Sequence, residues 1–272
     1  MEDACLRSTL AVSHEGILED QGRDPVAFFA QHGVASGDVL EDAVAIAAEY
    51  DRTPRDFVTD GPHVVTGPVH VDGAEPGDVL KIETLEAIPR VPYGVVSSRH
   101  GKGALALTAD GMPPAGITLD EVMPPVATDG RASGDPESFG NLSTFTAVDG
   151  DDGLMTFGSG SSAGTVRFPL RPFMGMMGVA FSQDTDPTAP SANSIPPTLG
   201  GGNIDVRQLG VGSTFYLPVQ ADGALFYVGD PHMAMGDGEV ALTLSAAADF
   251  IVTQVVDRTV GVHGLISKSH FG

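Results

Sequence analysis

The chain has 272 residues, of which 42% are hydrophobic and 18% charged, so it can bury the core of a globular protein. Its formal net charge is -22, from 36 acidic against 14 basic residues, and we therefore expect no nucleic-acid partner, because such a chain repels phosphates. The composition instead predicts a solvated acidic surface like that of proteins from halophiles, since molar salt screens charge repulsion within about 3 Å.

The cysteine content and the first residues bear on the cellular compartment. Cys5 is the single cysteine, so an intrachain disulfide and a thiolate metal cluster are both excluded. Residues 1–16 lack the basic start and apolar core of a signal peptide. No window reaches the roughly 18 apolar residues of a membrane span. We expect a cytoplasmic protein without a membrane partner.

Two helices are predicted near the start of the chain. In residues 24–33, Asp24 is a suitable N-cap, Pro25 suits the first helical position and Gly33 can end the helix. A longer helix is predicted over residues 38–50, where apolar residues recur with helical period.

After these helices the apolar period changes to two, which is typical of antiparallel strands. Residues 64–71 and 78–88 flank a Gly- and Pro-containing turn and predict one hairpin. Residues 212–220 and 224–230 flank Asp222-Gly223, a dipeptide that tolerates positive φ, and predict a second hairpin.

Further strands are predicted by alternation at 141–148, 239–244 and 249–257, whereas the rest of 108–164 is predicted as an insertion or a long loop system. The fold class expected is mainly β (α+β), with β-sandwich-like antiparallel sheets and a few short helices. We expect residues 1–60 to form an N-terminal helical segment packed on the sheet, and residues 61–272 to form the β-rich main domain.

Two motifs have plausible structural explanations. The acidic run at residues 149–153 lacks the later Glu of an EF-hand, where Gly160 stands, so we expect an exposed turn. Residues 160–164, GSSAG, match a nucleophile elbow, but a strand-like segment follows where an elbow needs a helix. The same glycine- and serine-rich run faintly resembles the amidase-signature hydrolases, whose serine works with a lysine. Lys81 or Lys102 would have to serve here, and those enzymes are considerably longer, so this alternative is weak.

The segment RHGKGAL at residues 99–105 carries cationic groups in a flexible loop. Arg99 and His100 can bind a carbonyl oxygen or a carboxylate. A basic turn that neutralises part of the acidic surface explains the same residues equally well.

Residues 200–209, GGGNIDVRQL, combine glycines with polar side chains. Asn203, Asp205 and Arg207 share one face if the segment is extended, and glycines let a backbone approach a ligand closely. The alternative is a surface pair between Asp205 and Arg207.

Residues 229–240, GDPHMAMGDGEV, place acids and an imidazole at the end of a predicted strand. Asp230 and His232 lie two residues apart, as do Asp237 and Glu239, so each pair points one way in an extended backbone. Oxygen and imidazole ligands on one edge indicate a site for a borderline-to-hard metal ion. An ordinary turn remains the alternative, because Asp and Gly also populate turns.

Four segments in chain order resemble the acetamidase/formamidase family: residues 63–80, 169–180, 201–219 and 223–240. The last two, GGNIDVRQLGVGSTFYLPV and GALFYVGDPHMAMGDGEV, are the most specific, and the resemblance covers roughly residues 60 to 260. It implies hydrolysis of small linear amides to a carboxylate and ammonia, on a β-rich fold in dimers or larger homo-oligomers. It also implies that these positions belong to the active centre: Asn203, Asp205, Asp230, His232, Asp237 and Glu239.

Two departures leave the substrate open. Gly200 stands where family members often have a histidine, and residues 98–105 have the character of a subgroup feature. Both can reshape a substrate pocket.

Amide hydrolysis needs an activated water, a group that stabilises the oxyanion and a proton for nitrogen. Cys5 is poorly placed as a nucleophile, and water activated by a metal or a carboxylate is the remaining route. We expect a divalent metal, zinc with calcium as the alternative, whose bound water has a pKa of about 7. The assigned roles are metal binding by His232, Asp230, Asp205 and His63, catalysis by Glu239 and Asp237, and substrate binding by Asn203, Arg99 and His100.

A different class of function stays open at this point. The same acids can hold a structural ion in a non-catalytic β-sandwich ligand-binding protein, and release of ammonia from short amides separates the two. For the enzyme we expect a small amide substrate and a homodimer or higher homo-oligomer.

Overall fold

The structure is a computed structural model that describes residues 5–12, 24–52, 63–99, 108, 110–113, 115–116, 118, 141–157, 163–180, 194, 197–236, 238, 244–245 and 248–257. Across these ranges antiparallel strands predominate and two α-helices are present, which confirms the mainly β fold class. In the described part of the chain, every helix is too short or too polar to cross a membrane.

The strands form two sheets. The smaller has four strands in the order β1-β13-β3-β10, and the larger has nine strands in the order β7-β6-β5-β4-β12-β11-β8-β9, with β2 paired to β11. The strands of the smaller sheet are β1 (Cys5–Val12), β3 (Val79–Pro89), β10 (Thr214–Pro218) and β13 (Ala248–Asp257). Those of the larger sheet are β2 (Val65–Val69), β4 (Tyr93–Arg99), β5 (Asn141–Asp149), β6 (Asp152–Phe157), β7 (Gly164–Pro169), β8 (Phe173–Gly178), β9 (Gly201–Asn203), β11 (Phe226–Ala234) and β12 (Leu244–Ser245).

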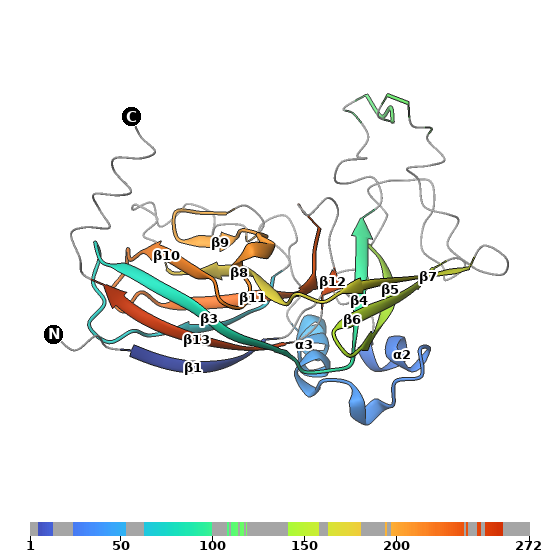
Figure 1. Cartoon of the computed structure of the whole chain (residues 1–272), viewed down its shortest axis with the longest axis horizontal. Coiled ribbons are helices and arrows are strands. Elements are labelled where there is room, and N and C mark those ends of the chain that lie inside the picture. Colours follow the sequence, from blue (N-terminus) through green and yellow to red (C-terminus); the bar gives the residue numbers. More distant parts are fainter. Residues whose placement is uncertain are drawn as a thin grey trace.

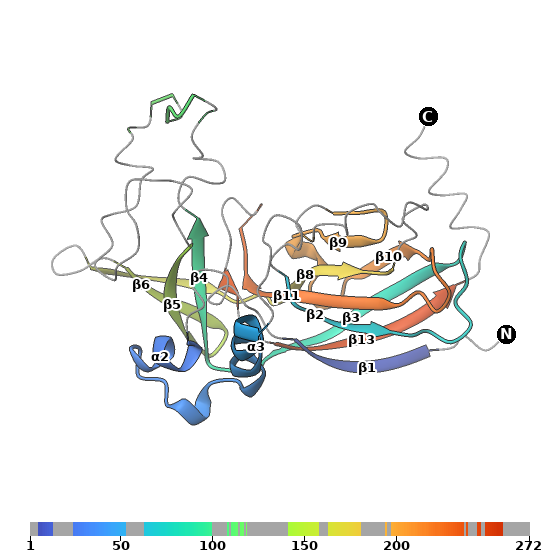
Figure 2. The same cartoon turned by 180° about the vertical axis from the view of Figure 1, so that it is seen from behind.

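The main core lies between the four-stranded sheet and one half of the nine-stranded sheet. Figures 1 and 2 show β1, β3 and β13 lying against β8 and β11. Leu80 and Ile82 of β3 pack in one apolar cluster with Met177 of β8 and with Phe226 and Val228 of β11. Each such side chain is almost fully buried and contributes about 1.5–3 kcal/mol of hydrophobic stabilisation.

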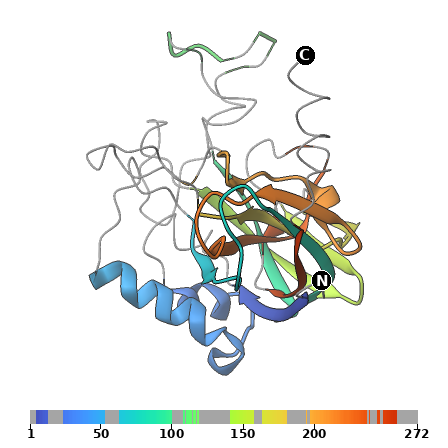
Figure 3. The same cartoon turned by 90° about the vertical axis from the view of Figure 1, so that its left-hand side faces the viewer.

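A second core lies where α2 (Pro25–Ala30) and the residues that follow it pack on the other half of the larger sheet. Helices α2 and α3 (Glu41–Arg52) lie on one side of the molecule, toward the lower edge of Figures 1 to 3. Phe28 and Phe29 pack there with Tyr93 and the partly buried Phe145.

Both predicted helices are confirmed. Asp24 caps α2, because its carboxylate accepts hydrogen bonds from the N–H groups of Val26 and Ala27 at 2.9 and 3.3 Å. Helix α3 begins at Glu41 and ends at Arg52, within a few residues of the predicted bounds.

The first predicted hairpin is wrong. Strand β2 pairs with β11, whereas β3 pairs with β10 and β13 in the other sheet. Pro68 in β2 has no N–H to donate, which suits an outer strand, while β3 buries alternate side chains in the main core. Burial of its apolar face therefore explains why β3 pairs with β10 and β13 and not with β2, the strand before it in sequence.

The second predicted hairpin is also wrong. Strands β10 and β11 flank Asp222-Gly223 but belong to different sheets. A tight hairpin turn needs positive φ at Asp222 and Gly223, whereas the left-handed residues here are Gly223, Ala224 and Leu225, at φ 75°, 54° and 53°. The left-handed stretch begins one residue later than a tight hairpin requires, and the connection leads the chain from the four-stranded sheet to the nine-stranded sheet.

The remaining strand predictions meet a mixed outcome. The predicted strands at 141–148 and 249–257 are confirmed as β5 and β13, and the predicted strand at 239–244 reaches the described residues only at Leu244 of β12. The assignment of the rest of 108–164 to loops is wrong at β6, which is a strand. This strand was missed because its short, glycine-containing sequence shows little alternation of apolar and polar residues.

The expected exposed turn at residues 149–153 is confirmed at residues 150–151, between β5 and β6. Asp149 and Asp152 on either side both form ion pairs with Arg167, at 2.6 and 2.7 Å. The strand expected after GSSAG is β7, so the structure supports the case against an elbow, although residues 160–162 lie outside the described ranges. The proposed division at residue 60 stays a prediction.

Candidate metal centre

The centre is built on two adjacent strands that are buried along almost their whole length. Asp230 and His232 of β11 are 7% and 2% exposed. Strand β8 pairs with β11 so that Met176 lies opposite Gly229 and Met174 opposite Pro231. This register sets Gly175 opposite Asp230.

The third residue comes from the connection that follows β9. Strand β9 pairs with β8, and the N–H groups of Ile204 and Asp205 then both donate to the Gly175 carbonyl, at 2.9 and 3.1 Å. Asp205 and Asp230 have φ values of 50° and 51°, a left-handed conformation that costs non-glycine residues about 1–3 kcal/mol. Two acids in this unfavourable conformation on neighbouring segments indicate that the backbone orients both carboxylates toward a common point.

The three side chains converge on one point. The Nε2 atom of His232 lies 3.0 Å from Oδ2 of Asp230 and 3.5 Å from Oδ1 of Asp205. One donor atom from each residue lies within 4.8 Å of the others, so the three form a group that can hold a metal ion. The ring of Phe173 contacts the imidazole, with centroids 4.7 Å apart, and helps to fix its plane.

His63 lies beside this triad. Its Nε2 atom is 3.8 Å from Oδ2 of Asp230, and its Nδ1 atom forms a hydrogen bond of 2.7 Å with Oγ of Ser194. A hydrogen bond at one ring nitrogen orients the other, as is common for metal-binding histidines. The role of His63 as a metal ligand stays a prediction.

The donor set fits a small divalent cation. A tetrahedral ion with bonds of about 2.0–2.1 Å keeps its donor atoms about 3.3 Å apart, which lies between the two separations measured from His232. Calcium takes oxygen donors, so an imidazole among the donors favours a more borderline ion. Asp230 is buried and Asp205 is partly buried beside it, which also favours a nearby positive charge.

The other predicted site residues are placed less completely. Asn203 ends β9, two residues before Asp205, and its backbone pairs with Met176. Arg99 ends β4, and its side chain is outside the described part of the structure. His100, Asp237 and Glu239 also lie outside the described residues.

Asp237 and Glu239 belong in sequence to the connection between β11 and β12. Ala234 pairs with Leu244, and His232 pairs with Ser245 on β12. The described ends of this connection therefore lie beside His232.

One local expectation fails. Asn203, Asp205 and Arg207 do not form one extended face, because the backbone is left-handed at Asp205 and a 3-10 helix, η5, spans Arg207–Leu209. Sequence reasoning also missed Gly175. The available signal was a glycine within an apolar run, which in a strand often marks a close approach.

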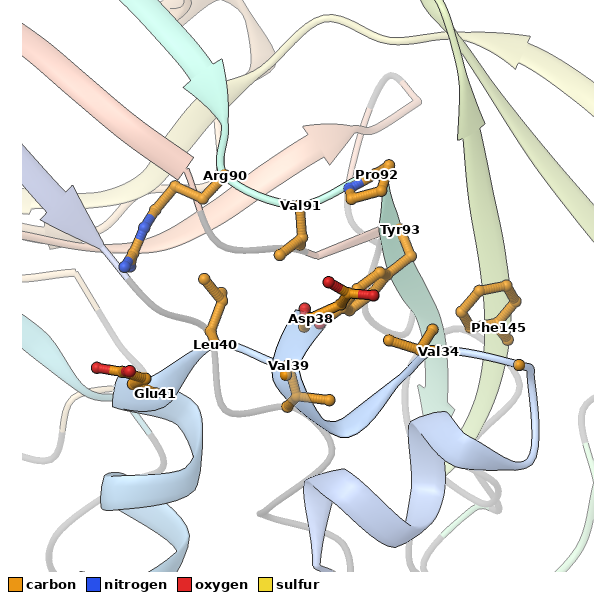
Figure 4. A pocket seen from close by; sticks show the side chains of 12 residues that line it. Val34, Asp38, Val39, Leu40, Glu41, Arg90, Val91, Pro92, Tyr93 and Phe145 are labelled. Atoms are coloured by element: carbon orange, nitrogen blue, oxygen red, sulfur yellow. Dashed lines mark hydrogen bonds between the residues drawn. The ribbon is translucent and has the colours of Figure 1, made fainter.

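A pocket of about 760 Å³ opens elsewhere, between the helical N-terminal elements and the link from β3 to β4. Figure 4 shows Tyr93 and Phe145 on one side of it and Arg90 pointing away from them. The Tyr93 hydroxyl donates to the Asp38 carbonyl at 3.1 Å, and burial raises the pKa of Tyr93. None of its lining residues belongs to the triad.

Comparison with known proteins gives a consistent result. The family model for the Acetamidase/Formamidase family matches residues 49–189 and 186–262. An acetamidase of Mycolicibacterium smegmatis is 27% identical over 202 residues, which cover 65% of this chain and 49% of that protein. The chain therefore spans about half the length of this relative.

Solved structures agree with the fold. A predicted acetamidase/formamidase of Thermoanaerobacter tengcongensis matches with a TM-score of 0.50 and 25% identity, over 72% of this chain and 51% of that one. A gamma lactamase of Delftia acidovorans matches with a TM-score of 0.56 over 97% of this chain and 61% of that one. At 19% identity the second match supports the fold alone.

Proposed function

The chain belongs to the acetamidase/formamidase family, and from this premise we propose that it hydrolyses small linear amides, such as formamide or acetamide, to a carboxylate and ammonia. The observation that carries the proposal is the convergence of Asp205, Asp230 and His232, of which Asp230 and His232 are buried and Asp205 is partly buried. An acetamidase is among its relatives, which supports the same reaction.

Three residues hold the proposed ion, which we take to be zinc. Asp205 and Asp230 provide two carboxylates and His232 provides one imidazole. His63, beside Asp230, is a further candidate ligand. A divalent ion bound there would supply a water with a pKa of about 7 and would polarise the amide carbonyl. The protein keeps the donors fixed, because they lie on paired strands and on a connection hydrogen-bonded to β8.

Glu239 handles the proton. As the water oxygen bonds to the carbonyl carbon, Glu239 takes a proton from that water, and it returns the proton to nitrogen as the C–N bond breaks. Asp237 provides a second carboxylate in the same segment. Support comes from the sequence position of Glu239 between Ala234 and Leu244, two residues that pair with each other next to the pair of His232 and Ser245.

Three residues bind the substrate. Asn203 lies two positions before the ligand Asp205 and offers an amide that can donate to the substrate oxygen. Arg99 is the last residue of β4, the strand that pairs with β12 next to β11, and His100 follows it in sequence. We assign both as donors to the same oxygen or to the product carboxylate.

An ammonia assay tests the proposal. Protein purified in molar KCl is supplied with a panel of short amides, before and after chelation, and its metal content is measured by elemental analysis. We expect ammonia release that is lost on chelation and restored by Zn²⁺. Metal-loaded protein that releases no ammonia from any of these amides contradicts the proposal and favours a binding protein with a structural ion.

Three further properties stay predictions: the adaptation of the acidic surface to high salt, a cytoplasmic location, and assembly into a homodimer or larger oligomer. The first follows from the net charge of -22.

A further inference from the structure

We infer that Gly175 is a positioning residue of the metal centre, which keeps open the space between the three ligand atoms and holds Asp205 in place. This inference rests on the proposed metal site and adds a residue from β8, the strand opposite the acid-imidazole pair. The inference explains why residue 175 has no side chain.

The backbone gives no other reason for a glycine. Gly175 lies in the middle of β8, a strand buried at every residue, and not in a turn. Its φ is outside the left-handed region, so an alanine can adopt the same backbone conformation. Glycine in a strand interior lowers stability, because it loses more entropy on folding than other residues and packs no side chain.

The surroundings supply the reason. A Cβ atom at Gly175 would lie 2.5 Å from Oδ1 of Asp205, 2.7 Å from Oδ2 of Asp230 and 2.8 Å from Nε2 of His232. These are its three nearest atoms and also the three proposed ligand atoms. A methyl group there takes up the space that an ion or its bound water needs, and pushes the donors apart.

The carbonyl of Gly175 orients Asp205, the ligand that lies farthest in sequence from the other two. Gly175 O accepts hydrogen bonds from Ile204 N and Asp205 N, at 2.9 and 3.1 Å. These bonds hold the chain where Asp205 adopts φ 50° and turns its carboxylate toward His232. Gly175 therefore leaves room for the ion on one side and holds a ligand segment on the other.

Binding of Zn²⁺ alone to chelator-stripped, full-length protein, measured by titration calorimetry, tests the inference. We expect Gly175→Ala to fold and melt cooperatively but to bind Zn²⁺ about 100-fold or more weakly, the upper range for disturbed metal surroundings. The matched control is Gly153→Ala on β6, where the new methyl also crowds atoms at 2.7 and 2.8 Å, those of the Phe168 ring. Phe168 packs against Met233 of β11, but the new methyl at Gly153 meets none of the three ligand residues, so we expect this variant to keep wild-type affinity.

A second pair of variants covers the case in which Gly175→Ala does not fold. Asp205→Gly suits the left-handed φ of this position and removes the nearest clash, and it leaves Asp230 and His232 as ligands. Adding Gly175→Ala to Asp205→Gly must still weaken the residual Zn²⁺ binding by about tenfold or more.

The outcomes separate this inference from the proposed function. If Gly175→Ala, or the double variant against Asp205→Gly, binds Zn²⁺ as tightly as its parent while the wild type is a zinc-dependent amidase, the inference alone is wrong. If the wild type binds no Zn²⁺, the metal proposal and the inference fail together. A Zn²⁺-binding wild type without amidase activity overturns the proposed function and leaves the role of Gly175 supported by its affinity data.

Discussion

Asp205 brings its Oδ1 atom to 3.5 Å from the Nε2 atom of His232, although the two residues lie on different segments of the chain. Asp205 follows β9, and His232 lies within β11, with β8 between these strands. The pair therefore exists only when three neighbouring strands are assembled in register.

The first prediction concerns this pair. Asp205→Asn keeps the size of the side chain but removes its charge, so we expect Zn²⁺ affinity and amidase kcat/KM to fall together by about 10–100-fold or more. Calorimetry and the ammonia assay measure the two effects. A variant with wild-type metal content and wild-type turnover removes Asp205 from the site.

The second prediction separates catalysis from metal binding. Glu239→Gln cannot take up a proton, so we expect kcat to fall by about 10²–10⁴-fold with unchanged Zn²⁺ content. Asp222→Asn is the control, because this exposed acid lies in the connection before β11 and outside the proposed site. Full activity of a folded Glu239→Gln enzyme rules out the assigned role.

The third prediction concerns salt. The net charge of -22 creates self-repulsion that dilute buffer does not screen, so the Tm is expected to rise from dilute to molar KCl. For a chain of this length each kcal/mol of regained stability raises the Tm by about 2–4 °C. Calorimetric or circular-dichroism melts at increasing KCl measure the shift. A Tm that stays level or falls contradicts adaptation to high salt.

The fourth prediction concerns alkaline pH. Burial, and secondarily the nearby Asp38 carboxylate, raises the pKa of Tyr93 above 10.0. The unfolded chain then loses this proton first, so Tyr93 contributes stability below pH 10 that is lost as pH rises through the folded pKa. Replacing Tyr93 by Phe should flatten this decline, as seen by comparing Tm against pH for both proteins.

Near neutral pH the same substitution has a separate effect. Tyr93→Phe removes the hydrogen bond to the Asp38 carbonyl, which should lower the free energy of unfolding by about 0.5–1.5 kcal/mol. Parallel Tm profiles for wild type and variant above pH 10 would show that Tyr93 does not titrate as proposed.

Local chemistry made the helices and several strands predictable from sequence. The Asp24-Pro25 start and the helical period of residues 38–50 depend on neighbours within a few positions, as does the alternation in β13. The partners of the strands did not follow in the same way. Both predicted hairpins failed because burial in a shared core, and left-handed residues after Asp222, sent adjacent strands to different sheets.

The metal centre was partly predictable for a similar reason. Asp230 and His232 are close in sequence, and their side chains meet at 3.0 Å, although Asp230 has a left-handed backbone and not the extended one on which the prediction rested. The approach of Asp205 to this pair was expected from the family resemblance, but its left-handed backbone was not. Gly175 was missed because its task is visible only from the atoms that surround an absent side chain.

The pairing of distant segments has a kinetic consequence. Cys5 pairs with Val255 across β1 and β13, and Val65 pairs with Gly229 across β2 and β11. Forming such contacts requires closure of very long loops, and chains rich in them fold slowly. The protein should therefore fold far more slowly than a helical bundle, and its ion should be captured only after this slow assembly has joined β8, β9 and β11.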